Sequence, residues 1–60
     1  MNIIKEKRKE KGLTQAQAAE LCGMARYYYI NIELGRRMPS VKTAKRIGEA
    51  LGFEWYRIFE

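Results

Sequence analysis

Sixty residues are enough for one small domain and leave no room for a second, so we expect residues 1–60 to form a single domain. The chain has one cysteine and no histidine, which excludes a disulfide framework and the usual zinc sites. All seven acidic residues are glutamates and Ser40 is the only serine, so the common general-base and triad chemistries lack their parts. We therefore do not expect an enzyme. The 12 lysines and arginines give a net charge of +5, which is typical of a nucleic-acid-binding domain.

The cellular setting is predicted from the apolar segments and the cysteine. No apolar run approaches the ~20 residues that span a bilayer, and no apolar segment comes after the lysine-rich start as in a signal peptide. The lone Cys22 lies in an apolar stretch and is expected to be a buried, reduced thiol. These features predict a cytoplasmic protein without membrane contact, metal, other cofactor or small-molecule ligand.

Glycines divide the chain into short segments in which apolar residues recur at three- and four-residue steps, the pattern of amphipathic helices. The first predicted helix is capped by Asn2 and extends to about Lys11, where Gly12 can supply a left-handed terminus. A capping box of threonine and glutamine over residues 14–17 opens the second helix, which extends to about Cys22.

Helical spacing resumes after Gly23 and continues over residues 25–34. The next helix is predicted over residues 41–51, because the residue before Pro39 avoids helical geometry and Ser40 can cap a helix that begins directly after it. A short fifth helix is predicted around residues 55–59. The expected architecture is an all-α, compact five-helix bundle, and the two helices that flank the turn at Gly23 have the spacing of a helix-turn-helix.

Short motifs at fixed spacing run through nearly the whole chain without a gap. They are Gly12-Leu13-Thr14-Gln15, Ala19-Glu20, Gly23, Ile32-Glu33, Gly35-Arg36-Arg37, Pro39-Ser40, Thr43, Ile47, Ala50-Leu51-Gly52 and Ile58-Phe59. Together they resemble the Cro/repressor-type helix-turn-helix family, also called the xenobiotic-response-element family. The resemblance implies a lambda-repressor-like domain whose third helix enters the major groove of double-stranded DNA. It also implies a sequence-specific transcriptional regulator, a repressor of phage, plasmid or mobile-element type.

The resemblance places Arg26, Tyr27 and Asn31 against the bases, and helical geometry puts Ile30 on the same face. An arginine can bond guanine with two hydrogen bonds, and an asparagine suits the N6 and N7 atoms of adenine. Two interpretations of Ile30 stay open: contact with a thymine methyl group, or packing under the ring of Tyr28.

Four further residues are expected to contact phosphates, which orient a protein on DNA without reading its sequence. The resemblance places Gln15 at a phosphate, although a polar helix start also explains this residue. The hydroxyl of Tyr28 can reach a phosphate, and Arg36 and Arg37 come after the third helix at positions typical of backbone contacts.

Glu33 calls for a structural explanation because an acid beside DNA would repel it. The resemblance pairs this position with an arginine of the first helix, here Arg8, which ties the third helix to the bundle. We also expect the ring of Tyr29 to fill the volume that the small Ala18 leaves, since interiors are close-packed. Ala25 stands where the family usually has a capping serine or threonine, so the third helix is predicted to lack that cap.

One recognition helix reads few base pairs, and related regulators overcome this with two-fold dimers. We expect Trp55, Ile58 and Phe59 to face the core and Tyr56 to face outward, where the family commonly carries an acid. Tyr56 is therefore the candidate interface residue of a homodimer on DNA.

A protein-interaction module is the alternative function, for example an antitoxin that binds a toxin and its own operator. The expected grouping of Arg26, Arg36, Arg37 and Gln15 on one side favours DNA, because the cores of protein interfaces are depleted in charge.

Overall fold

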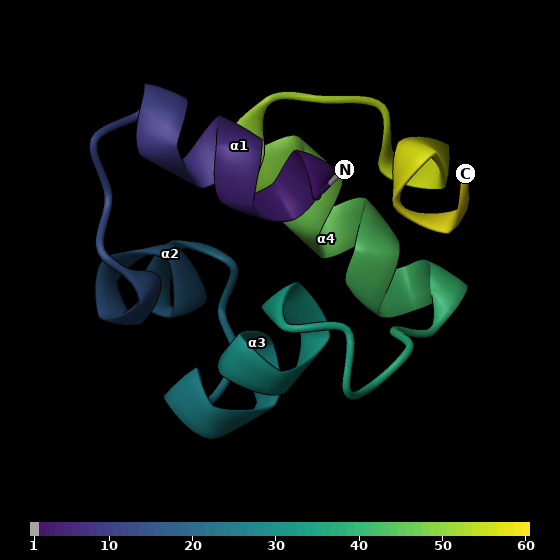
Figure 1. The fold of residues 1–60 in the computed structure, drawn as a ribbon, viewed down its shortest axis with the longest axis horizontal. Coiled ribbons are helices and arrows are strands. Elements are labelled where there is room, and N and C mark those ends of the chain that lie inside the picture. The colour runs from purple at the N-terminus through teal and green to yellow at the C-terminus, as the bar shows by residue number, and fades with distance from the viewer. Residues whose placement is uncertain (1) are drawn as a thin grey trace.

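The computed structural model describes residues 2–60, and the regular elements within them are all helical (Figure 1). In chain order they are α1 (Ile3–Glu10), α2 (Gln15–Leu21), α3 (Arg26–Glu33), α4 (Val41–Leu51) and the 3-10 helix η1 (Trp55–Phe59). Helix α4 packs against α1 and η1, and α3 packs mainly against α2. The predicted all-α bundle is confirmed. None of these helices is long and apolar enough to cross a membrane.

The helix starts obey local sequence signals. The side chains of Asn2, Thr14 and Ser40 accept hydrogen bonds from the first turns of α1, α2 and α4. The Gln17 side chain also accepts from the backbone N–H of Thr14 at 2.9 Å, which completes the predicted capping box. Helix α3 starts after Ala25 and has no side-chain cap, as predicted.

The core gathers small side chains, branched side chains and one tyrosine ring from four helices and the turn after α2. Its buried members are Ile4, Ala18, Ala19, Cys22, Tyr29, Ile32, Ile47 and Leu51. Tyr29 and Ala18 are both 0% exposed, which agrees with the large ring taking the volume beside the small side chain. Cys22 is buried as predicted, and burial raises the pKa of its thiol to about 11.

The expectation that Phe59 faces the core is wrong, because its side chain is 42% exposed. Trp55 and Ile58 are partly buried. The helix type explains the difference. A 3-10 helix has 3.0 residues per turn, so residues three apart align and the residue four along is rotated away by about 120°. An α-helix would have kept all three side chains on one face.

Gly48 allows the chain to fold back closely over the last turns of α4. A Cβ atom at this position would lie 2.7 Å from the carbonyl oxygen of Phe53 and 3.0 Å from the Cα of Trp55. Both neighbours are backbone atoms, which cannot move aside as a side chain would. The contact between α4 and η1 therefore requires a glycine here.

We predict that Gly48→Ala destabilises the domain, although alanine favours an α-helix by about 1 kcal/mol over glycine. The steric clash with the backbone should outweigh that gain and cost about 1–3 kcal/mol in the free energy of unfolding. Urea denaturation monitored by circular dichroism measures the change. Glu49→Ala, at the exposed neighbouring position, is the control. A Gly48→Ala protein more stable than the wild type would show that the segment after α4 moves freely.

Candidate nucleic-acid interface

Helices α2 and α3 form a helix-turn-helix with a tight connection. Gly23 has φ = 71°, and its N–H donates to the carbonyl of Glu20 at 3.0 Å. The N–H of Met24 donates to the carbonyl of Ala19 at 3.0 Å, which closes the end of α2. The left-handed conformation at Gly23 strongly favours glycine. In Figure 1, α3 lies at the edge of the bundle.

The face of α3 opposite the core carries the side chains expected at the bases. Arg26 is exposed, and Tyr27 is 78% exposed. Ile30 and Asn31 are partly buried, and Ile30 packs against the core. That packing accounts for an apolar residue at this position without DNA. Contact of these four residues with bases stays a prediction.

The amide of Asn31 has a partner within α3. Its Nδ2 donates to the backbone carbonyl of Tyr27 at 2.9 Å. To bond an adenine, the side chain must exchange this contact for one with the base. The sequence carries no signal for this local bond, because asparagine on a helix surface can point either to its own backbone or to solvent.

The segment after α3 presents two exposed arginines. The N–H groups of Arg36 and Arg37 both donate to the carbonyl of Asn31, at 2.9 and 3.2 Å. The guanidinium of Arg37 lies over the Tyr28 ring, 5.1 Å from its centroid. A cation held on an aromatic face loses less freedom when it binds an anion. Contact of both arginines with phosphates stays a prediction, and the stacking on Tyr28 was not predicted from the sequence.

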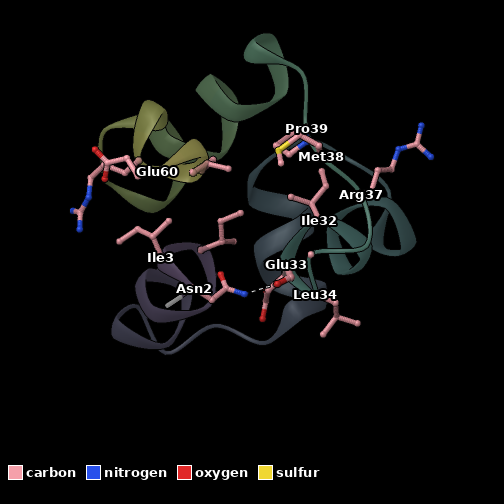
Figure 2. Close-up of a pocket in the computed structure, with 13 residues that line it drawn as sticks. Asn2, Ile3, Ile32, Glu33, Leu34, Arg37, Met38, Pro39 and Glu60 are labelled. Atoms are coloured by element: carbon pink, nitrogen blue, oxygen red, sulfur yellow. Dashed lines mark hydrogen bonds between the residues drawn. The ribbon is translucent and has the colours of Figure 1, made fainter.

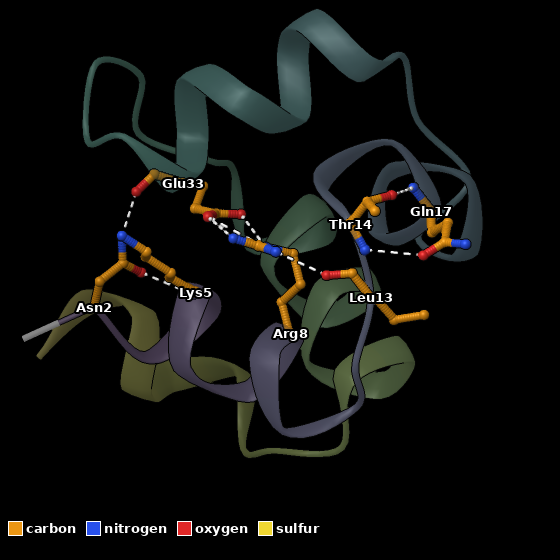
Figure 3. A network of polar contacts seen from close by, with 7 residues as sticks. All are labelled: Asn2, Lys5, Arg8, Leu13, Thr14, Gln17 and Glu33. Atoms are coloured by element: carbon orange, nitrogen blue, oxygen red, sulfur yellow. Dashed lines mark hydrogen bonds and ion pairs between the residues drawn. The ribbon is translucent and has the colours of Figure 1, made fainter.

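Arg8 and Glu33 form a salt bridge between α1 and the end of α3 (Figure 3). Arg8 Nη2 lies 2.9 Å from Glu33 Oε1, and Arg8 Nε lies 3.1 Å from Oε2. Arg8 Nη1 also donates to the carbonyl of Leu13 at 2.7 Å. The exposed fractions of the side chains are 11% for Arg8 and 1% for Glu33. The guanidinium thus connects α1, the loop before α2 and α3.

Opposing effects set the ionisation of Glu33. Burial by itself raises the pKa of its carboxyl group, but interactions with Arg8, Tyr29 and Gln15 outweigh burial and leave the pKa below its ordinary value. The buried hydroxyl of Tyr29 is close enough to stabilise the carboxylate, although their geometry falls short of a regular hydrogen bond. Gln15 is partly buried at the start of α2 and contributes least of these groups to lowering the pKa of Glu33. It stays a candidate phosphate ligand.

The helix-turn-helix family model matches residues 4–56. An HTH-type transcriptional regulator of Bacillus subtilis, YqaF, is 49% identical over 57 residues, which are 95% of this chain and 75% of the relative. The ImmF control region 10 kDa protein of Bacillus phage phi105 is 53% identical over 75% of this chain and 50% of its own length. The immunity repressor protein of the same phage is 43% identical over 85% of this chain and 35% of its own length. No solved structure gives a significant match.

The chain therefore belongs to the Cro/repressor-type helix-turn-helix family of DNA-binding regulators. It spans between about a third and three quarters of the lengths of these three relatives.

We predict that Glu33→Gln strongly destabilises the domain at pH 7. The change leaves the Arg8 charge without its partner, and breaking a fully buried pair costs about 3–5 kcal/mol. Because the pKa of Glu33 is lowered on folding, its contribution is present above the unfolded pKa of about 4.3 and is lost as the pH falls through the folded value. The difference between variant and wild type should therefore shrink at acid pH.

Thermal melting at pH 7 and at about pH 3 measures both effects. Glu49→Gln, which neutralises an exposed acid on α4, is the matched control and should melt within a few degrees of the wild type. An unchanged midpoint for Glu33→Gln would contradict a stabilising role for the pair.

Proposed function

We propose that this chain is a sequence-specific regulator that inserts α3 into the major groove of operator DNA and represses transcription in a phage, plasmid or mobile element. The outward face of α3 carries this proposal, since Arg26 and Asn31 lie there with the exposed ring of Tyr27. Family membership supports it, as do relatives named as an immunity repressor and as a transcriptional regulator. The proposal includes no catalytic role.

The proposed docking uses contacts to bases and contacts to phosphates. Arg26 and Asn31 read guanine and adenine edges, Tyr27 adds a ring beside them, and the exposed part of Ile30 can touch a thymine methyl group. Gln15, Tyr28, Arg36 and Arg37 fix the register on phosphates. The stacking of Arg37 on Tyr28 supports a phosphate role for both residues, because it holds the guanidinium in a defined place before DNA arrives.

Selection of sites from random duplex DNA, combined with titration of variants, tests this proposal. Asn31→Ala should cost about 1–3 kcal/mol on the best site and relax the preference at one base pair. Arg36→Ala should weaken binding to all sequences nearly alike. The logarithm of the affinity should fall with the logarithm of the salt concentration with a slope of about −0.9 per neutralised phosphate.

Comparison of Asn31→Ala with Arg36→Ala distinguishes contacts that read bases from contacts that position the protein on phosphates. A change of the selected motif by Arg36→Ala, with none by Asn31→Ala, would contradict the docking described here. A wild-type protein without sequence preference, whose binding is insensitive to salt, would instead favour the protein-interaction alternative.

We further propose that two copies bind each operator as a symmetric homodimer. The Tyr56 side chain on η1 is 50% exposed, and Phe59 is exposed on the same short helix. Exposed aromatic side chains on one terminal element favour burial against a second copy. The described surface is small, so the dimer is expected to be weak without DNA.

We predict that the protein sediments mainly as a monomer alone and as two copies per duplex on the selected site. Tyr56→Glu should weaken the second binding step, whereas Tyr56→Phe, which keeps the ring, should not. Analytical ultracentrifugation with labelled duplex measures the stoichiometry. A saturated complex with one copy per duplex would contradict the homodimer. Normal pairing by Tyr56→Glu would show that the interface lies elsewhere.

A further inference from the structure

Asn2 makes two hydrogen bonds that connect segments far apart in the chain (Figure 3). Its Oδ1 accepts from the backbone N–H of Lys5 at 3.1 Å, which is the cap of α1. Its Nδ2 donates to the backbone carbonyl of Glu33, 31 positions later, at the last residue of α3. In Figure 2 the two residues meet beside a pocket of about 350 Å³ between the start of α1, the end of α3 and the C-terminal segment.

The two bonds also determine which way the amide group points. The Lys5 N–H is a donor and requires the oxygen of the Asn2 side chain. The Glu33 carbonyl is an acceptor and requires its nitrogen. Rotating the amide by half a turn would set donor against donor and acceptor against acceptor, so the orientation is determined by its partners.

The Glu33 carbonyl needs a partner from outside α3, because the last carbonyls of a helix have none within it. The backbone N–H groups of the next four residues bond elsewhere: Leu34 donates to Ile30, Gly35 to Ile32, and Arg36 and Arg37 to Asn31. Asn2 therefore supplies the hydrogen bond that the turn after α3 does not.

The hydrogen bond from Asn2 lies where it can restrain the orientation of α3. Helix α3 packs mainly against α2, and polar contacts from Asn2 and Arg8 attach its far end to the start of the chain and to α1. Those contacts meet at one residue: Arg8 binds the Glu33 side chain and Asn2 binds its backbone carbonyl. Two attachments to different atoms of one residue restrict both the position and the tilt of the helix end, which a single ion pair does not.

We infer that Asn2 is a positioning residue for the DNA-reading helix: it sets the orientation of α3 relative to α1 and α4 without contacting DNA. This inference rests on the proposed function and adds a residue to it. A small tilt of α3 displaces Arg26 and Asn31 relative to the base edges, so sequence-specific affinity depends on the bond while non-specific affinity depends on it less.

The test separates the two bonds of Asn2. Asn2→Ser and Asn2→Asp both retain a good cap for α1, but serine is too short to reach Glu33 and aspartate has no donor. Ser40→Ala is the matched control, because it removes the cap of α4 with a comparable loss of stability and leaves the end of α3 untouched.

Residual dipolar couplings of the backbone amides, measured without DNA, report the orientation of α3 relative to α4. We expect them to show a reoriented α3 in both Asn2 variants and an unchanged one in Ser40→Ala. Affinity for the selected site should fall about two- to tenfold in both Asn2 variants, the range of one hydrogen bond, with a smaller change on random DNA and none in Ser40→Ala.

The possible outcomes test the role of Asn2 separately from the proposed DNA-binding function. An unchanged orientation of α3 in both Asn2 variants would overturn the positioning role, whatever the DNA data show. Equal losses on selected and random DNA would overturn it as well. A wild-type protein that selects no DNA would refute the proposed function, and the dipolar couplings would still decide whether Asn2 orients α3.

Discussion

The ion pair between Arg8 and Glu33 joins α1 to α3, the helix that carries the candidate DNA-binding face, and the geometry of that candidate interface depends on it. Taking a carboxylate out of water costs several kcal/mol, which only well-placed partners offset. Glu33 has such partners, and its pKa stays below the ordinary value although its side chain is 1% exposed. The charge is thus a constraint: it is stable only while α1 and α3 keep their relative places.

The small core makes this polar constraint more important. A chain of 60 residues buries a modest apolar surface, and α3 packs mainly against α2. The hydrophobic effect is non-directional. Hydrogen bonds from Arg8 and Asn2 have defined directions, so they add a restraint on the orientation of the end of α3. The buried ring of Tyr29 connects the apolar core with the polar contacts at Glu33, since it fills the core and lies near the Glu33 carboxylate.

The candidate DNA-binding surface is partly organised before DNA arrives. Arg37 is held over the Tyr28 ring, which reduces the freedom lost when a guanidinium meets a phosphate. Asn31 is different, because its amide already bonds the Tyr27 carbonyl and, in the proposed docking, exchanges that bond for one with a base. The exchange lowers the net gain from a contact with the correct base, because on a wrong base Asn31 can keep its bond to Tyr27. In the proposed docking, the contacts to phosphates are thus partly arranged in advance, and the contacts to bases form only on DNA.

The sequence by itself determined the four α-helices, their caps at Asn2, Thr14 and Ser40, and the helix-turn-helix, because these depend on neighbours within one turn. The resemblance to the helix-turn-helix family added the prediction that Arg8 pairs with Glu33. Only the tertiary structure decided that Asn2 also binds the end of α3, and that the 3-10 geometry of the last element exposes its final ring. Both facts depend on where segments meet in space, and residues 31 positions apart carry no local signal of their contact.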